Sequence, residues 1–169
     1  MIIGGQAVLF YGEPRLTKDI DITLGLGVEK LPVIKDAARA LGLRIDIEDA
    51  ESFVKETLVL PTSDDKGLRV DFLFSITPFE RAAIERAREV KFDEVPVRFA
   101  SLEDLIIHKM VAGRPRDIED VRSILWKNPD YDRAYIQSWL SEFDEATGDD
   151  CRRRFDAVAS EIAKEAGNS

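Results

Sequence analysis

The chain has 169 residues and a formal net charge of -9, with 44% hydrophobic and 34% charged residues. This length suits one domain, or one domain with an extension, and it is long enough to bury a hydrophobic core. The composition is that of an ordinary globular protein. The acidic balance repels nucleic acid unless a local basic patch compensates for it.

Membrane association and disulfide bonding are both unexpected. No apolar run approaches the roughly 20 residues that a membrane-spanning helix needs, and no cleavable leader is recognisable before Gly4 and Gly5. Cys151 is the only cysteine, which excludes an internal disulfide and a cysteine-rich zinc site. We therefore expect a cytoplasmic protein without a membrane partner.

The first hundred residues alternate between short apolar stretches and amphipathic ones. Strands are expected at residues 1–3, 18–24, 43–47, 57–61 and 68–75, and a further strand or hairpin at residues 90–99. Helices are expected at residues 6–11, 31–41, 50–56 and 78–88. The pattern predicts an α+β fold in which helices pack on a mixed β-sheet.

Strand patterns end at residue 100, and amphipathic helical patterns follow. Helices are expected at residues 101–112, 116–127, 131–143 and 149–166. Ser101 begins a capping box for the first of them, and Gly113-Arg114-Pro115 separates the first from the second. We therefore divide the chain into an α/β core, residues 1–100, and a C-terminal helical region, residues 101–169.

Three aspartates stand out on the predicted strands. The sequence KDIDITL at residues 18–24 alternates, which places Asp19 and Asp21 on one face and Ile20 and Ile22 on the other. Asp71 lies within a second apolar strand, where an unpaired carboxylate is costly to bury. Asp71 alone could simply face solvent. Two like charges on one strand face, with a third on a neighbouring strand, repel one another and favour a bound cation.

Magnesium would relieve this repulsion. Mg²⁺ prefers oxygen ligands and is usually held by one or two carboxylates together with substrate phosphates. Two Mg²⁺ ions at Asp19, Asp21 and Asp71 would activate an attacking hydroxyl and stabilise a leaving pyrophosphate. Gly4 and Gly5, just before a predicted helix, would let a phosphate approach the backbone and the helix N-terminus.

The segment from Gly4-Gly5-Gln6-Ala7 to Arg15-x-Thr17-x-Asp19-Ile20-Asp21 resembles the signature of the DNA polymerase β-like nucleotidyltransferase superfamily. The resemblance implies a nucleotidyltransferase-type sheet and a nucleoside triphosphate substrate. It implies that the glycine pair closes the triphosphate pocket and that Asp19 and Asp21 bind Mg²⁺. Asp71 matches the third acidic residue, which that family places on a later strand.

Within the superfamily, the Arg-x-Thr-x-Asp-x-Asp form and residues 109–120 (KMVAGRPRDIED) resemble the AbiEii-type toxins and related small nucleotidyltransferases. This resemblance implies a lysine on one helix, matched by Lys109, and an aspartate on the next, matched by Asp120 or Asp117. Both would face the active site, so that the helical region completes it. The choice between the two aspartates stays open.

The resemblance and the charges together define the candidate site. By charge, Arg15 and Lys109 would neutralise phosphate, and Arg114 would do the same or contact an acceptor. The predicted catalytic residues are Asp19, Asp21, Asp71 and Lys109. The predicted nucleotide-binding residues are Gly4, Gly5, Arg15, Thr17, Lys109, Arg114, Asp117 and Asp120.

These residues predict a Mg²⁺-dependent enzyme that moves a nucleoside monophosphate from an NTP to an acceptor hydroxyl. By resemblance the acceptor is a tRNA 3′ end or a protein hydroxyl, and the chain could be a toxin paired with an antitoxin. One alternative is transfer to a cationic small molecule such as an aminoglycoside. Another is a non-catalytic nucleotide-binding or interaction module.

Simpler structural roles are also open. Lys109 could be an exposed helix residue, and Asp117 and Asp120 could be first-turn acids favoured by the helix dipole. Arg15 could pair with Asp19 or Glu13 across its loop. The aromatic residues expected to pack in the helical core are Trp126, Tyr131, Tyr135 and Trp139.

The N-terminus departs from the resembled family in one respect. There a helix usually precedes the first strand, whereas here Met1 is already within the strand. If that helix is absent, an apolar face of the sheet would be uncovered, and oligomerisation is then expected.

Overall fold

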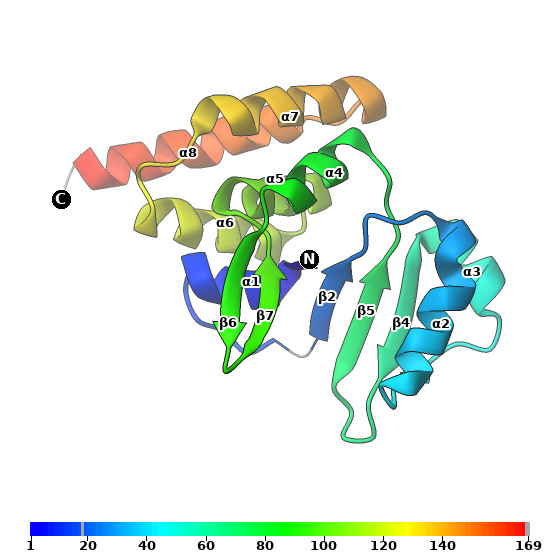
Figure 1. Cartoon of the computed structure of the whole chain (residues 1–169). Helices are drawn as coiled ribbons and strands as arrows, with labels where there is room; N and C mark the ends of the chain where they lie inside the picture. The colour runs from blue at the N-terminus through cyan, green and yellow to red at the C-terminus, as the bar shows by residue number, and fades with distance from the viewer. Residues whose placement is uncertain (18, 168–169) are drawn as a thin grey trace. The chain divides into compact units, whose positions relative to one another are not determined.

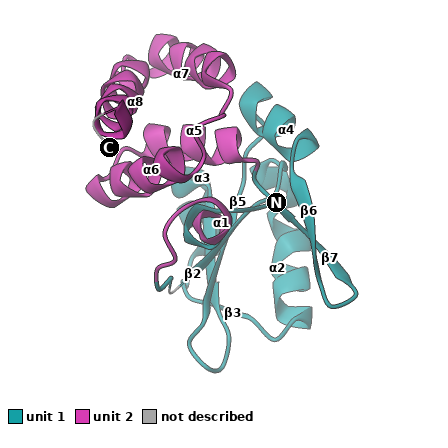
Figure 2. Cartoon of the chain, turned by 90° about the vertical axis from the view of Figure 1, so that its left-hand side faces the viewer, with its two compact units in different colours: residues 1–6, 16–100 teal, residues 7–15, 101–169 magenta. Residues whose placement is uncertain are grey.

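The computed structural model describes residues 1–17 and 19–167 (Figure 1). The chain divides into two compact units, one of residues 1–6 and 16–100 and the other of residues 7–15 and 101–169 (Figure 2). Residues 7–15 therefore group with the helices that follow residue 100. Lys18, which the sequence places in a strand, lies outside the described residues.

The first unit is built on a mixed sheet, as the sequence predicts. Within the described residues it has seven strands in the order β3-β4-β5-β2-β1-β7-β6. Their bounds are β1 Ile2–Ile3, β2 Asp19–Thr23, β3 Arg44–Ile45, β4 Val59–Ser63, β5 Arg69–Leu73, β6 Arg88–Phe92 and β7 Val95–Phe99. Strands β2 and β5 run parallel, as do β1 and β7, and the other neighbours are antiparallel.

Helices accompany this sheet in the order that the sequence predicts. Their bounds are α1 Gly4–Tyr11, α2 Leu31–Ala40, α3 Ala50–Thr57 and α4 Pro78–Glu85, with a 3₁₀ turn at Val28–Lys30. Helix α1 starts in the first unit and continues into the second, because the division falls after Gln6. Thr77 caps α4 by accepting a hydrogen bond from the Glu80 N–H at 3.1 Å, as expected for a residue preceding Pro78.

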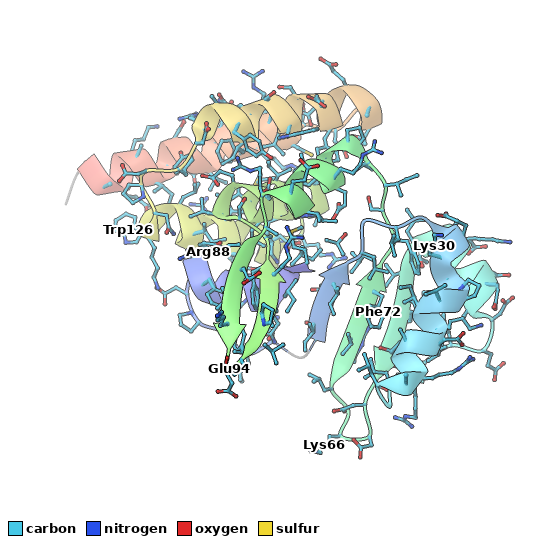
Figure 3. All side chains as sticks on the ribbon, viewed as in Figure 1. Lys30, Lys66, Phe72, Arg88, Glu94 and Trp126 are labelled. Carbon is cyan, nitrogen blue, oxygen red and sulfur yellow. The ribbon has the colours of Figure 1, made fainter. Side chains whose placement is uncertain are left out.

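One face of the sheet is apolar and is covered by α2 and α3. Leu31 of α2 and Val54 of α3 pack with Leu60 of β4 and Phe74, and Phe72 of β5 joins this cluster (Figure 3). Leu60 and Phe72 are cross-strand partners, so they lie on the same face. Because side chains alternate along a strand, the neighbours of Phe72 in sequence face the other way.

The second unit is helical. Its helices after residue 100 are α5 Leu102–Ala112, α6 Pro115–Lys127, α7 Arg133–Thr147 and α8 Cys151–Gly167. Ser101 accepts a hydrogen bond from the Asp104 N–H at 3.2 Å, so the predicted cap of α5 is present. Gly113 has a φ of 62°, the left-handed conformation that ends α5, and Pro115 follows as the first residue of α6.

The core of the helical unit is mainly aliphatic, and one of the aromatic residues predicted to pack in it lies at the surface. Residues that are fully buried in it include Leu105, Ile106, Met110, Ile124, Ile136, Leu140 and Phe155. Tyr131 contacts Phe155 edge-on, and Tyr135 contacts Trp139 edge-on. Trp126 is 50% exposed, so its predicted place in the core is wrong.

No helix within residues 1–17 and 19–167 combines the length and the apolar character that a bilayer crossing requires.

The apolar face of the sheet gives a stability prediction. Leu60 is fully buried between β4 and the two helices, so Leu60→Ala should lower the free energy of unfolding by about 2–5 kcal/mol. Leu41→Ala is the matched control, because Leu41 is 74% exposed and its truncation should cost little. Urea denaturation followed by circular dichroism measures both. Equal losses for the two variants would contradict this packing.

Candidate functional site

The aspartates on β2 and β5 lie on a common face. In the parallel pairing of these strands Asp21 stands opposite Asp71, and Asp19 stands opposite Arg69. Directly opposed residues on neighbouring strands point to the same side of a sheet, and so do residues two apart on one strand. The face that bears Asp19, Asp21 and Asp71, here called the acidic face, is therefore opposite to the one that α2 and α3 cover.

The Asp21 carboxylate of the acidic face lies so close to Gly4 that the position favours glycine. The φ of Gly4 is +65°, and a Cβ added to it would lie 1.9 Å from the Asp21 Oδ2. Any other residue would therefore be strained in its backbone and would collide with this carboxylate. Asp21 is packed against the first residue of α1, and Gly5, the next residue, is buried. Gly4 and Asp21 therefore form one local structure in the first unit.

Thr17 is anchored to the same segment. The Gln6 Nε2 donates a hydrogen bond to the Thr17 Oγ1 at 2.5 Å. Gln6 directly follows the glycine pair, so this bond ties the Arg-x-Thr part of the motif to the start of α1. The sequence did not single out Gln6 as a site residue, although its position beside Gly5 was the available signal.

Asp71 is electrostatically strained. Burial raises the pKa of Asp71, an effect that the Arg69 guanidinium at 3.1 Å only partly offsets, and the nearby charges of Asp19 and Asp46 raise it further. The Asp46 N–H donates to the Pro61 carbonyl at 3.2 Å, and Pro61 is the cross-strand partner of Asp71. Asp46 is thus a fourth carboxylate beside the acidic face, and the sequence did not identify it.

The donor set of the acidic face fits magnesium in combination with phosphate. Within the described residues, no three or more Asp, Glu, His or Cys side chains are grouped closely enough to hold a metal ion by themselves. Mg²⁺ needs only one or two carboxylates where phosphates supply further oxygens. The opposed pair Asp21 and Asp71 matches that requirement, and the three-aspartate metal site stays a prediction.

The second unit contains a separate group of charges, here called the Lys109 cluster: Arg15, Lys109, Asp117 and Asp120. The Lys109 Nζ lies 2.6 Å from the Asp117 Oδ1 and 2.9 Å from the Asp120 Oδ2. Arg15 donates from both Nε and Nη2 to the two carboxylate oxygens of Asp120, each at 2.8 Å. This bidentate geometry fixes the guanidinium plane.

Burial distinguishes this cluster from the acidic face. Lys109, Asp117 and Asp120 are 7%, 7% and 5% exposed, so the interpretation of Lys109 as an exposed helix residue is wrong. Burial alone would raise the pKa of Asp120, but the hydrogen bonds from Arg15 and Lys109 outweigh it and the pKa is lowered. Two cations and two carboxylates balance, which makes the cluster electrically neutral.

Helix geometry brings the cluster together. Asp117 and Asp120 are three residues apart on α6 and therefore share one face, which meets Lys109 near the end of α5. A residue other than glycine at position 113 would be strained because the φ there is +62°, and the Arg154 guanidinium would have to move away from its Cβ. Both aspartates contact Lys109, so the structure does not choose between them. The Arg114 side chain is exposed at the N-cap of α6.

The Lys109 cluster gives a second stability prediction. Lys109→Met should lower the free energy of unfolding by about 3–5 kcal/mol, because it leaves buried carboxylates without their cation. Lys127→Met is the matched control, since Lys127 pairs with Glu13 on the surface and that pair contributes at most about 1 kcal/mol. Thermal and urea unfolding measure the difference. If Lys109→Met were as mild as the control, the cluster would not be a buried neutral unit.

Several solved structures are similar to this chain, and the first of those described here shares its fold. A nucleotidyltransferase-like protein from Paracoccidioides brasiliensis is 13% identical with a TM-score of 0.51, over 92% of this chain and 83% of that one. The lincosamide antibiotic adenylyltransferase LnuA, bound to lincomycin, is 12% identical with a TM-score of 0.48, over 73% and 83% of the two chains. The antibiotic-resistance factor ANT(2″)-Ia is 15% identical with a TM-score of 0.47, over 99% and 83%.

A search of the curated proteins finds no match. The decisive comparison is with family models, because one family covers most of the chain. The family described as "Nucleotidyl transferase of unknown function (DUF2204)" matches residues 1–156, and the chain therefore belongs to this family of nucleotidyltransferases.

Proposed function

We propose that this nucleotidyltransferase moves a nucleoside monophosphate from an NTP to an acceptor hydroxyl in a Mg²⁺-dependent reaction. The observation that supports this best is the opposition of Asp21 and Asp71 on the acidic face, with Gly4 packed against the Asp21 carboxylate. In the transfer, the acceptor oxygen bonds to the α-phosphorus while the bond to pyrophosphate breaks. The electron pair of the broken bond leaves with pyrophosphate.

Asp19, Asp21 and Asp71 would hold the metal, as two Mg²⁺ ions with substrate phosphates completing their ligands. When bound, magnesium supplies the positive charge that polarises the phosphates and offsets the repulsion among the carboxylates. Asp71 would hold the second ion or accept the proton of the acceptor hydroxyl. Its raised pKa suits proton acceptance better than that of an ordinary carboxylate.

The nucleotide would be positioned by groups of the continuous motif. The backbone at Gly4 and Gly5 offers a close approach for phosphate oxygens, and Gln6 holds Thr17 in place. Arg15 would meet phosphate charge with donors that its bidentate pair with Asp120 orients. Lys109, with Asp117 and Asp120, would support Arg15, and the exposed Arg114 would contact the acceptor or a phosphate.

Charge favours an acceptor that is not a polyanion. The chain has a formal net charge of -9, and Asp46 adds to the carboxylates near Asp71. A cationic small molecule with a hydroxyl would be attracted to such a surface, whereas RNA would be repelled. We therefore place a small cationic acceptor first.

A second candidate function is that of an AbiEii-type toxin that modifies tRNA or a protein and acts beside an antitoxin. The observation that favours it is the Lys109 cluster, since the resemblance to that branch rests on Lys109 and on an aspartate at position 117 or 120. In this case the acceptor would need a local basic contact such as Arg114.

An assay with labelled NTPs and Mg²⁺ tests these proposals. Label on a hydroxyl of an aminoglycoside would support the first acceptor, and label on total tRNA or on protein would support the second. Asp19→Ala with Asp21→Ala should abolish transfer, as should chelation of Mg²⁺, whereas Asp65→Ala in the exposed loop after β4 should retain it. NTP binding without transfer, unchanged in the double variant, would indicate a non-catalytic module.

Asp71 gives a prediction that separates stability from activity. Its pKa is raised in the folded state, so the folded protein binds this proton more tightly than the unfolded chain does. Stability is therefore lost as the pH rises from the ordinary carboxyl value of about 3.9 through the raised one. Asp71→Asn removes this loss and should raise the melting temperature slightly at neutral pH.

Transfer by the same Asp71→Asn variant should fall by at least about a hundredfold, because a ligand of the second metal or a proton acceptor is gone. The gain in melting temperature should fade below about pH 4, where the Asp71 carboxyl becomes protonated in the unfolded chain as well as in the folded protein. Asp65→Asn is the control for both measurements, since Asp65 is exposed in the loop after β4. A variant that is less stable than the parent at neutral pH would contradict the electrostatic strain at Asp71.

A further inference from the structure

The hairpin of β6 and β7 projects from the sheet of the first unit. The strands are joined by a two-residue turn at Asp93 and Glu94, and Figure 3 labels Glu94 at its tip and Arg88 at the start of β6. Among the described residues, β7 pairs with β1 at a single position, where Phe99 stands opposite Ile2. A two-stranded ribbon with so little support is marginally stable in water.

The outer edge of β6 is the end of the sheet. Antiparallel partners alternate between pairs that exchange hydrogen bonds and pairs that do not. The pair next to the two-residue turn, Phe92 and Val95, is of the bonded kind. Lys91 and Pro96 are then a non-bonded pair, which agrees with the absence of an N–H on proline.

This alternation fixes which backbone groups are directed away from β7. The N–H and C=O groups of Arg88, Val90 and Phe92 pair with β7, so those of Glu89 and Lys91 point to the outer edge. On β7 the corresponding position is Pro96, which has no donor. On its other side β7 faces β1, whereas β6 is the last strand of the described sheet and its outer edge is open.

The residues of β6 complement a second copy of themselves. Its sequence is Arg-Glu-Val-Lys-Phe, and Arg88, Glu89 and Lys91 are exposed. If two such strands pair antiparallel about Val90, Glu89 of each stands opposite Lys91 of the other. These are the two residues whose backbone groups point outward, so each opposed pair exchanges both N–H···O=C bonds. The register that satisfies the outward backbone groups is therefore also the one that places opposite charges side by side.

We propose that two copies of this chain associate through β6, paired antiparallel about a two-fold axis at Val90. The contact continues the sheet of each first unit into that of its partner. It pairs opposite charges twice and places Val90 against Val90, in the isologous manner of a two-fold dimer. The Arg88 and Phe92 side chains, the latter 51% exposed, meet across the axis on the same side as Val90.

The partner is a second copy because the edge is self-complementary. A partner strand of uniform charge would leave Glu89 or Lys91 opposite a like charge, which is destabilising. This inference is independent of the proposed function, since none of the residues of β6 belongs to the acidic face or to the Lys109 cluster. It also differs from oligomerisation through an uncovered sheet face, because it uses the edge of the sheet.

Charge exchange tests the pairing. The parent protein should be dimeric in sedimentation equilibrium and should dissociate on dilution. Lys91→Glu opposes Glu89 to a glutamate, and Glu89→Lys opposes two lysines. Each single variant should raise the dimer dissociation constant by about tenfold or more, because two attractive pairs become repulsive. Lys66→Glu, in the exposed loop before β5, is the control and should remain dimeric.

Two further measurements distinguish pairing from a general loss of structure. The double variant Glu89→Lys with Lys91→Glu restores opposite charges and should regain the dimer. The two single variants, mixed, should form a heterodimer, since one has two lysines and the other two glutamates at these positions. A monomeric parent at all concentrations, or single variants that stay dimeric with circular dichroism unchanged, would overturn the proposal.

Discussion

Apolar packing on one face of the sheet holds three carboxylates together on the other, the acidic face. Asp21 and Asp71 are opposed on neighbouring strands, an arrangement that is unfavourable without a cation. The strands stay in this register because their other face is apolar, with Leu60 and Phe72 packed against α2 and α3. A slip of one residue would turn these side chains to the wrong side. Packing on one face therefore maintains electrostatic strain on the other.

The two groups of charges differ in how they are compensated. In the Lys109 cluster each buried carboxylate has a cation of the chain beside it, and the pKa of Asp120 is lowered. On the acidic face Arg69 only partly offsets the effect of burial, and the pKa of Asp71 is raised. A carboxylate whose pKa is raised by burial and by neighbouring carboxylates is a candidate for binding a cation, whereas one whose pKa is lowered by cations of the chain is already neutralised. This contrast supports the proposal that the metal would bind at the acidic face, beside Asp71.

Local patterns predicted much of this structure, and long-range pairing supplied the rest. Alternation along residues 18–24 was enough to place Asp19 and Asp21 on one face, and capping signals located Ser101 and Thr77. The bond between Arg15 and Asp120 joins residues 105 positions apart, so no local pattern contains it. Asp46, which follows β3, is near Asp71 only because β3 and β5 both pair with β4. Trp126 lies on α6, and a large aromatic side chain alone does not predict whether a helix position is buried; here it is 50% exposed.

Charged residues on an edge strand usually prevent association. In β6 the effect depends on the order of the charges along the strand. A strand with lysines alone repels every copy of itself, which is how many sheets protect their edges. In β6 the glutamate and the lysine flank Val90 symmetrically, so the same side chains that repel a shifted register stabilise the one centred on Val90. On the other side of the hairpin, toward β1, Pro96 removes one backbone donor. Two features of the same ribbon therefore act differently: the proline removes a donor whatever the partner, whereas the paired charges favour the register centred on Val90 over those that oppose like charges.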